Sequence, residues 1–504
     1  MGTETTPRGD YIQGEFLAID DPNGEIVSRN PGDLEQTSLR FPFSFEHVHE
    51  AVASARKSFS TWRRTPLPQR QQVIKRYREL MKERGRDLAH AITWEIGKPL
   101  WESALEVQET LDLIDYTIEN GVPAEMAIPN ADRGCQGSVR FLPRGVMAVI
   151  TPATVPVYAS HFHFLPALIH GDTAVVKSSK SAPWVGQLLA EIAHDSGMPA
   201  GVLNLLQGDA ELGRRLVCHT DIDGVLFTGS FETASKIQKQ TLSDFGKLLV
   251  LDAGGKNAMV VWSDCDYKRA LTDALYSAFL TSGQRCTSTS RILVHEKLID
   301  KFCTDLHALA KKSRVDFGLK EGKDAPFLGP LVNEEAMENY LRFQGIAVRE
   351  GAEEIMRGKP LEREKKGYYV SPSIHRVETP EPKSVYQTSE IYGPNIAVYS
   401  VNEIEQAAEV INMTQQGLVA SIYTGARENF LRLADEAQVG LLHWNRPTTC
   451  TAFRLPYAGI KHSGNSRPMG SFAWQQCTYP VSSLEWQGGE EHETLPPVIP
   501  KLEG

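Results

Sequence analysis

The sequence predicts an α/β fold with a doubly wound parallel sheet and a second α/β region after it. Two observations support this fold class. Between about 146 and 252, short apolar runs alternate with stretches of helix-like periodicity, as expected for a sheet wound by helices on both faces. From about 256 to 470 the alternation continues. With 504 residues, the chain can bury a large core and divide it between two or three domains.

The segment before the first apolar run is predicted to be helical. Over 45–119, apolar residues recur at steps of three and four, beginning with Val48, Ala51, Ala55 and Phe59. The charged, Arg/Lys-rich stretch 69–85 follows, and after it the stretches 86–96 and 101–119. We therefore expect outer helices whose charged runs form solvated faces.

The first sheet is predicted from five apolar runs and the four helical stretches between them. These helical stretches begin near Pro, Ser or Asp, which favour helix starts. The expected strands are Val146–Ile150, Thr173–Lys177, Val202–Leu206, Gly224–Phe227 and Leu248–Leu251, and the expected helices are 157–170, 182–196, 209–218 and 231–242.

The residues just after these strands are the first candidates for a binding site, because ligands of doubly wound sheets lie at the carboxyl ends of the strands. These positions carry glycines and small hydroxyls, which allow a backbone to approach a phosphate, although the Gly-x-Gly-x-x-Gly fingerprint is absent. The segments are 151–154, 178–180, 207–209, 228–230 and 252–255.

The second α/β region is predicted from the same kind of pattern, without an internal repeat. The tail 487–504, rich in Glu and Pro, is expected to be a surface arm or a disordered end. The expected helices lie near 267–281, 297–313 and 404–412, and the expected strands include Ile292–Val294, Ala397–Tyr399 and Ala420–Tyr423.

Composition excludes several classes of function. A net charge of −10 and a pI near 5.8 argue against nucleic acid and anionic membranes as partners. No run of 18 apolar residues and no secretory signal occur. The seven cysteines form no CxxC and no regular framework, which predicts reduced thiols in a cytoplasm and no metal site.

One cysteine has a setting typical of a nucleophile. Cys286 lies in Gly-Gln-Arg-Cys-Thr-Ser at 283–288, between an expected helix and an expected strand. Asp252 lies 34 positions upstream (286 − 252), at the end of a strand and before Gly254 and Gly255. A thiol with its own carboxylate base points to covalent chemistry on a carbonyl.

Four motifs occur in a recognisable order: Phe-Thr-Gly-Ser at 227–230, Gly-Gln-Arg-Cys-Thr at 283–287, Glu-Ile-Tyr-Gly-Pro at 390–394 and Pro-Tyr-Ala-Gly-Ile-Lys-His-Ser-Gly at 456–464. Through them, nearly the whole chain resembles the aldehyde dehydrogenase superfamily. Within it, the segments 443–447 and 463–468 most resemble the N-succinylglutamate 5-semialdehyde dehydrogenases of arginine catabolism.

The resemblance implies an aldehyde dehydrogenase-like architecture and an oligomeric assembly. It implies a nicotinamide dinucleotide-binding domain, a catalytic domain and an oligomerisation arm that would build a homodimer or a homotetramer. The implied ranges are 1–124 and 146–252 for the cofactor domain, 253–472 for the catalytic domain, and 125–145 and 473–486 for the arm.

The resemblance also implies that Cys286 attacks an aldehyde and that water hydrolyses the resulting thioester. Arg285, with the positive ring of the cofactor, would favour the thiolate. Asp252 stands where the family usually has a glutamate that activates this water, and a misplacement of about 1 Å can cost ~100-fold in rate. Thr154 stands where the family has an asparagine that donates to the oxyanion, a donor typically worth ~10²–10³ in rate.

Cofactor contacts follow from the same resemblance, and they leave NAD and NADP open. Lys180 replaces a glutamate that holds the ribose hydroxyls in many NAD enzymes, so a 2′-phosphate is expected to be tolerated or preferred. Ala234 replaces a glycine of the helix beside the pyrophosphate. The full set of expected cofactor residues is Thr151, Lys177, Lys180, Gly208, Gly229, Ser230, Ala234 and Glu390.

The substrate is expected to be a small aldehyde, and an acidic semialdehyde would need cations around it. Arg446, Arg454 and Lys461 stand in the region that lines the substrate funnel in the family. Two alternatives remain open. The thioester could be released to a thiol such as coenzyme A, or the chain could be a catalytically weak relative with a binding or assembly role.

Overall fold

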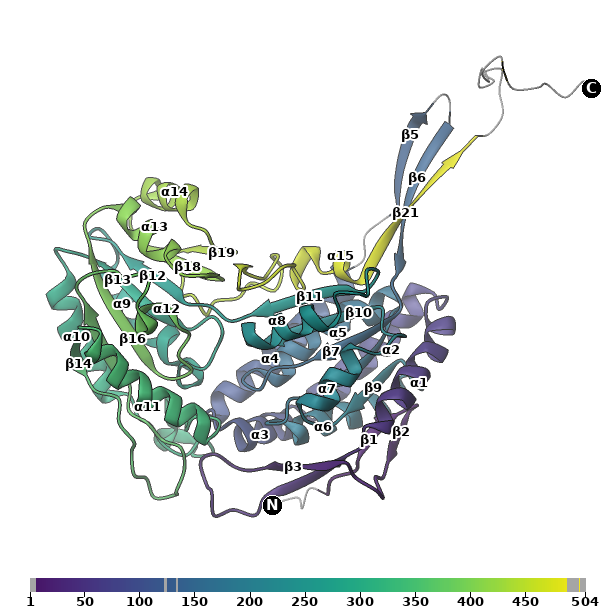
Figure 1. Cartoon of the computed structure of the whole chain (residues 1–504), viewed down its shortest axis with the longest axis horizontal. Coiled ribbons are helices and arrows are strands. Elements are labelled where there is room, and N and C mark those ends of the chain that lie inside the picture. Colours follow the sequence, from purple (N-terminus) through teal and green to yellow (C-terminus); the bar gives the residue numbers. More distant parts are fainter. Residues whose placement is uncertain (1–5, 122–124, 133–134, 487–497, 499–504) are drawn as a thin grey trace, which may run out of the picture.

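Two sheets, each covered by helices on both faces, form the two halves of the molecule, and a narrow β arm projects from one of them (Figure 1). The computed structural model describes residues 6–121, 125–132, 135–486 and 498. The predicted tail, 487–504, lies outside the described residues except for Val498.

The first sheet confirms the predicted doubly wound topology. Its strand order is β11-β10-β7-β8-β9-β1-β2, and the first five strands in this order are parallel. The strand order reverses at β7, so the crevice for a ligand is expected between the ends of β7 and β10. The strands are β1 (Asp10–Ile12), β2 (Glu15–Leu17), β7 (Val146–Ile150), β8 (Thr173–Lys177), β9 (Leu203–Leu206), β10 (Gly224–Gly229) and β11 (Leu248–Ala253).

Helices cover this sheet close to the predicted ranges. α1, α7 and α8 pack on one face, α5 and α6 pack on the other, and α2 to α4 add an outer layer over α5 and α6 (Figure 1). The helices are α1 (Glu46–Trp62), α2 (Leu67–Glu83), α3 (Gly85–Ile96), α4 (Leu100–Asn120), α5 (Pro156–His170), α6 (Pro183–Asp195), α7 (Ala210–Val217) and α8 (Phe231–Gln240).

The stretch 69–85 forms a largely exposed charged face of α2, as expected, whereas several charged residues in α3, in α4 and between them are buried. Glu95, Glu102 and Glu106 are at most 2% exposed, and so is Lys98. Burying a charge is costly unless it is paired and hydrogen-bonded, and each of these side chains has partners. Through these contacts Glu95 holds the start of α6, Glu106 holds the start of α5, and Glu102 holds the segment at Thr281.

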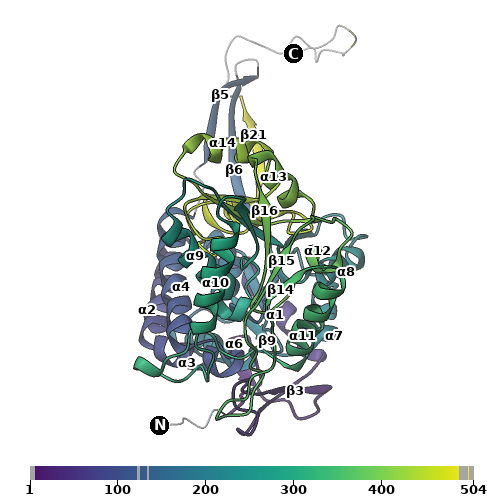
Figure 2. The same ribbon diagram turned by 90° about the vertical axis from the view of Figure 1, so that its left-hand side faces the viewer.

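The second sheet is mainly parallel and has the order β14-β15-β16-β13-β12-β18-β19. Alternate residues of its central strands face opposite ways, so that α9 and α10 cover one face and α11 and α13 the other (Figure 2). The elements are β12 (Asn257–Val261), α9 (Tyr267–Phe279), β13 (Thr289–His295), α10 (Ile299–Lys312), α11 (Glu334–Arg349), β14 (Glu353–Met356), β15 (Ser373–Val377), α12 (Val385–Thr388), β16 (Asn395–Val401), α13 (Ile404–Asn412), β18 (Val419–Tyr423), α14 (Arg427–Glu436) and β19 (Leu441–Trp444).

The two segments expected to form an arm pair with each other. β21 runs antiparallel to β6, and β6 runs antiparallel to β5, which gives the sheet that projects in Figure 1. The remaining elements are short. The arm strands are β5 (Met126–Asp132), β6 (Cys135–Pro143) and β21 (Thr478–Glu485), and the short elements are β3 (Gly24–Ser28), β4 (Leu39–Phe43), β17 (Gln416–Gly417), β20 (Ile460–Lys461), α15 (Trp474–Cys477) and the 3₁₀ turns Leu280–Gly283, Gly322–Asp324 and Gly470–Phe472.

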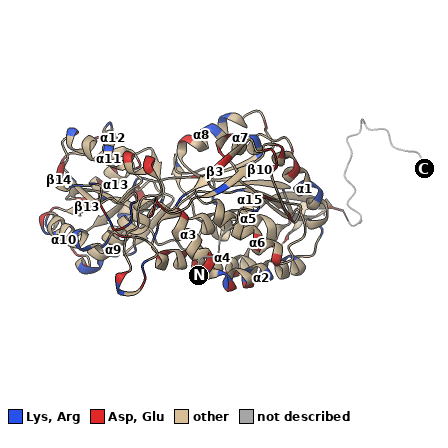
Figure 3. Cartoon of the chain, turned by 90° about the horizontal axis from the view of Figure 1, so that it is seen from below, with Lys and Arg blue, Asp and Glu red and all other residues tan. Residues whose placement is uncertain are grey.

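Charged residues of both signs are distributed over both halves (Figure 3). Within the part of the chain that the structure describes, no helix combines the length and the apolar character needed to cross a membrane.

Candidate active site

A strained loop between α9 and β13 presents the predicted nucleophile. Thr281, Ser282 and Gly283 have φ values of 54°, 53° and 73°, in the left-handed region that is costly for residues with a side chain. A Cβ atom at Gly283 would collide with the carbonyl of Gly393. The loop therefore turns sharply before Cys286, which is half-buried at the boundary between the two halves.

Two buried polar side chains hold this loop. The Asn257 amide at the start of β12 donates to the carbonyls of Cys286 (2.7 Å) and Ser288 (2.9 Å). Glu102 of α4 accepts from the Thr281 N–H at 3.0 Å and from the Thr281 hydroxyl. Buried and fully bonded, these groups stabilise one loop conformation, which compensates for its backbone strain.

Arg285 favours the Cys286 thiolate only weakly, because its guanidinium is engaged elsewhere. Its guanidinium binds Glu102 at 3.0 Å and the Thr281 hydroxyl at 2.9 Å. Burial, followed by the charge of Asp252, raises the pKa of Cys286 to about 12, while the Tyr457 hydrogen bond and, more weakly, the charge of Arg285 oppose this rise. Arg285 is thus chiefly a structural partner of Glu102.

Asp252, the predicted base, is buried at the end of β11. Its Oδ2 accepts from the Thr228 hydroxyl at 3.1 Å, whereas its Oδ1 has no hydrogen-bond partner within the described part of the chain. His163 of α5 contacts the same hydroxyl through Nε2 at 2.7 Å. Burial raises the pKa of Asp252 to about 7, so its carboxylate can take up a proton near neutral pH.

Tyr457, which the sequence analysis did not single out, touches the nucleophile. Its hydroxyl lies 3.4 Å from Cys286 Sγ. Burial, followed by the charges of Cys286 and Asp252, raises the pKa of this phenol well above its usual value. The half-buried Cys286 and the buried Asp252 and Tyr457 therefore form one cluster, assembled from β11, the loop after α9 and the segment after β19.

Thr154 is held through its backbone at the start of α5. Its carbonyl accepts from Lys98 Nζ at 3.1 Å, and Lys98 pairs with Glu106. Glu106 in turn accepts from the N–H groups of Val157 (2.8 Å) and Tyr158 (3.0 Å), which are free donors of the first turn of α5. This arrangement fixes the backbone that carries the Thr154 hydroxyl.

A cavity of about 350 Å³ lies between the two halves and connects two expected cofactor residues. Ser230 caps α8, accepting from the Thr233 N–H at 3.3 Å, and the helix start lines the cavity through Ser230, Phe231 and Glu232. Glu390 lines the opposite side and accepts from the Gly255 N–H at 3.3 Å. Helix starts of this kind attract phosphate groups.

Close contacts with side chains explain two glycines in or next to this cavity. A Cβ atom at Gly229 would lie 2.5 Å from the Phe227 ring, and one at Gly254 would overlap the Glu390 carboxylate. Ala234, in contrast, is buried within α8, whose packing accommodates its methyl group. The N-terminus of α8 thus offers a cradle that fits a pyrophosphate.

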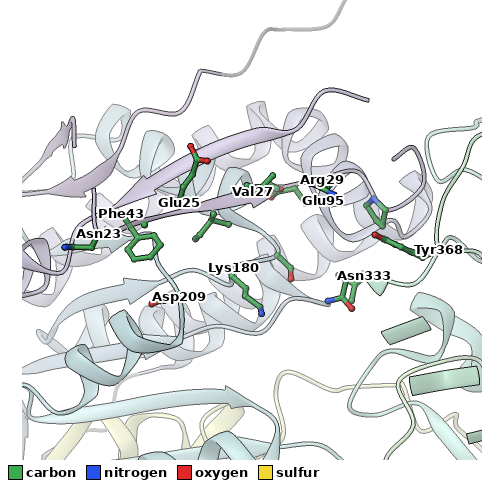
Figure 4. Close-up of a pocket in the computed structure, with 16 residues that line it drawn as sticks. Asn23, Glu25, Val27, Arg29, Phe43, Glu95, Lys180, Asp209, Asn333 and Tyr368 are labelled. Carbon is green, nitrogen blue, oxygen red and sulfur yellow. Dashed lines mark hydrogen bonds between the residues drawn. The ribbon is translucent and has the colours of Figure 1, made fainter. Parts of the chain in front are cut away.

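A second cavity, of about 550 Å³, contains Lys180 (Figure 4). Lys180 lies between Asp209 and Asn333 in this view, and Arg29 is the other cation of the lining. The acidic members of the lining are Glu25, Glu95 and Asp209. A cavity with both signs of charge fits either ribose hydroxyls or a 2′-phosphate.

The other expected cofactor residues lie at neighbouring strand ends of the first sheet. Thr151 follows β7, and its N–H contacts the Lys177 carbonyl at 3.4 Å. Lys177 ends β8, where burial lowers its pKa to about 8. A Cβ atom at Gly208 would lie 2.6 Å from Leu212, so the turn into α7 requires glycine.

Comparison with known proteins decides the family. The model of the aldehyde dehydrogenase family matches residues 20–482. The chain belongs to the aldehyde dehydrogenase family. It is 33% identical over 477 residues to an N-succinylglutamate 5-semialdehyde dehydrogenase of Chromobacterium violaceum, covering 94% of this chain and 96% of that protein.

Solved structures agree with this assignment. An NAD-dependent aldehyde dehydrogenase from Sinorhizobium meliloti superposes with a TM-score of 0.92 at 25% identity, covering 97% of each chain. An E. coli NADP dependent enzyme superposes with a TM-score of 0.89 at 26% identity, covering 95% of this chain and 98% of that one. This chain is an aldehyde dehydrogenase with the α/β fold predicted from the sequence.

The three cations expected around an acidic aldehyde differ in availability within this aldehyde dehydrogenase. Lys461 donates to the carbonyls of Asn412 (3.2 Å) and Thr414 (3.1 Å), so its ammonium is occupied. Arg454 lies over the ring of Tyr116, 5.6 Å from its centroid. Arg446 lies 3.1 Å from the sulfur of Cys450, with an exposed side chain.

Proposed function

We propose that this chain oxidises an acidic semialdehyde, with N-succinylglutamate 5-semialdehyde as the candidate, to its carboxylate through a thioester on Cys286. The observation that carries the mechanism is the cluster of Cys286 with the buried Asp252, one of whose carboxylate oxygens has no hydrogen-bond partner among the residues that the structure describes. The name of the C. violaceum relative supports the substrate.

In this proposal Cys286 and Asp252 perform successive steps. The Cys286 thiolate forms a bond to the aldehyde carbon, and the resulting oxyanion accepts hydrogen bonds from the Cys286 N–H and the Thr154 hydroxyl. After oxidation, Asp252 takes a proton from the water that attacks the thioester. The C–S bond then breaks, and its electron pair returns to sulfur.

NAD or NADP, when bound, would supply the acceptor for the hydride that leaves the substrate carbon. Ser230 and the start of α8 would hold the pyrophosphate, and Glu390 would hold the nicotinamide ribose. Lys177 and Lys180 would contact the adenosine side. The names of the S. meliloti and E. coli structures support both cofactors.

The test is rapid mixing of the enzyme with N-succinylglutamate 5-semialdehyde and NAD or NADP, followed at the absorbance of the reduced nicotinamide. A burst near one equivalent per subunit, followed by turnover, supports the thioester mechanism. Turnover that requires added coenzyme A would instead favour thiol acylation. No Cys286-dependent signal with this or other aldehydes would favour the binding role.

Lys180→Glu should shift the cofactor preference. The change removes the cation facing a 2′-phosphate and introduces a repelling carboxylate. A charged hydrogen bond is worth ~1.5–3 kcal/mol, so the ratio of kcat/KM for NADP to that for NAD should fall ~10–100-fold. Lys239→Glu, at the exposed far end of α8, should leave the ratio unchanged. A strong NAD preference that survives Lys180→Glu contradicts the role.

Hydrolysis should depend on pH through Asp252. The base acts in its ionised form, and its pKa is raised to about 7. Below pH 7, the steady-state rate should therefore fall about tenfold per pH unit, and above it the rate should level off. The kcat between pH 5.5 and 8.5, corrected for the amount of active enzyme by burst amplitude, measures this dependence. A flat profile would exclude Asp252 as the limiting base.

The assembly and location are parts of the same proposal. We propose that the sheet β5-β6-β21 joins subunits into a homodimer or homotetramer in the cytoplasm. Its exposed apolar residues include Met126, Ile128 and Leu484, which a partner subunit would cover. We propose the same ranges as before: 1–124 and 146–252 for the cofactor domain, 253–472 for the catalytic domain, and 125–145 and 473–486 for the arm.

A further inference from the structure

The ring of Tyr457 is fixed beside the nucleophile. Its side chain is 5% exposed and packs near Phe162, with ring centroids 6.2 Å apart. Its backbone N–H contacts the Met469 carbonyl at 3.4 Å. The hydroxyl, 3.4 Å from Cys286 Sγ, is within hydrogen-bonding distance for sulfur. Packing rather than solvent therefore sets where this hydroxyl points.

The other charged groups around Cys286 give its thiolate little support. Asp252 from β11 and Glu390 from the segment after α12 are acidic, and both oppose a negative charge on sulfur. Arg285, from the same loop as Cys286, is engaged by Glu102 at 3.0 Å. Of Asp252, Glu390, Arg285 and Tyr457, it is Tyr457 whose side chain lies within hydrogen-bonding distance of the sulfur.

The direction of this hydrogen bond follows from the acidity of the two groups. Burial, followed by the charges of Cys286 and Asp252, raises the pKa of Tyr457 well above its usual value, so the phenol keeps its proton. A thiolate has no proton to donate. The hydroxyl therefore donates to the sulfur once Cys286 is ionised, and hydrogen bonds to ionised acceptors are the stronger kind.

We propose that Tyr457 is a catalytic hydrogen-bond donor that stabilises the Cys286 thiolate before attack and again when the thioester releases it. The phenol proton stays on oxygen throughout. The sulfur electron pair forms the C–S bond during attack and returns to sulfur, facing the same hydroxyl, when this bond breaks. The inference rests on the thioester mechanism proposed above and adds a residue to it.

The test is alkylation of Cys286 by iodoacetamide in the wild-type enzyme and in Tyr457→Phe. The rate is measured between pH 6 and 11 by mass spectrometry of the Cys286 peptide. This range lies below the pKa of the thiol, about 12, so the rate at each pH reports the fraction of thiolate, which the loss of a hydrogen bond to a charged group should lower. Alkylation at a fixed pH below this pKa should then be ~10–100-fold slower.

Tyr158→Phe is a matched control. Tyr158 belongs to the same apolar cluster, but its hydroxyl contacts Met469 Sδ at 3.1 Å instead of Cys286. This variant should titrate like the wild type. If Tyr457→Phe also titrates like the wild type, the inference is overturned. Should Tyr457→Phe fail to fold, Tyr457→His retains a ring N–H donor, and its thiol should ionise more readily than that of Tyr457→Leu.

The alkylation assay separates this inference from the proposed function, because it needs neither aldehyde nor cofactor. A Tyr457-dependent titration in an enzyme that oxidises no tested aldehyde would support the hydrogen bond while contradicting the function. Conversely, an unchanged titration in an enzyme with an active burst would overturn the role of Tyr457 alone.

Discussion

Replacement of Cys286 by Ala should abolish oxidation, with a loss of about 10⁴-fold or more in kcat/KM, the scale expected when a covalent nucleophile is removed. Without the sulfur, no bond to the aldehyde carbon can form, and no thioester can accumulate. The measurement is the burst of reduced nicotinamide together with the steady-state rate. Both should disappear.

The control for this prediction is Cys303→Ala. Cys303 is a buried cysteine of α10 that packs in the core of the second half. Its removal should lower the free energy of unfolding by ~1 kcal/mol, within the usual range for a point substitution, and should leave the burst amplitude per folded subunit intact. Comparable burst amplitudes in Cys286→Ala and the wild type would exclude Cys286 as the nucleophile.

Asp252→Asn should separate acylation from hydrolysis. The amide keeps the shape of the side chain but cannot accept a proton from water. The burst should therefore remain near one equivalent, while the turnover that follows should fall by ~10²–10⁴-fold, the usual contribution of a general base. Rapid mixing resolves the two phases in one experiment.

Asp252→Glu tests the length of the base. If the longer glutamate places its carboxylate nearer the water, turnover should rise, whereas a site built around the shorter chain should lose activity, by ~100-fold for a displacement of about 1 Å. The control for both Asp252 variants is Asp244→Asn, which changes a partly exposed residue paired with Lys247 and should leave turnover unchanged. If turnover is also unimpaired in Asp252→Asn, another group is the base.

The elements of the first half were predictable because their signals are local. The apolar runs Val146–Ile150 and Thr173–Lys177 coincide with β7 and β8, and the helix expected at 157–170 is α5. Strands and helices bury residues at fixed periods, so a short window of sequence is enough to identify them. The second half was predicted less completely, and the long helix α11 was not identified.

The position of the nucleophile and base at the ends of elements was also readable from the sequence. Cys286 does follow a helix and precede a strand, and Asp252 does end a strand before two glycines. The family motifs added the cofactor residues, of which Ser230 and Glu390 line the same cavity. Their roles as catalytic and binding groups stay predictions until the kinetic experiments are done.

The sequence by itself therefore determined the fold class, the family and the candidate nucleophile. Only the tertiary structure decided what surrounds that nucleophile. The Tyr457 hydroxyl contacts its sulfur although the two residues lie 171 positions apart, and the Arg285 guanidinium donates to Glu102. The physical reason is that periodicity records whether a residue is buried, but not which distant residue it meets. Partners of buried polar groups are set by how the elements pack, and no local window contains that information.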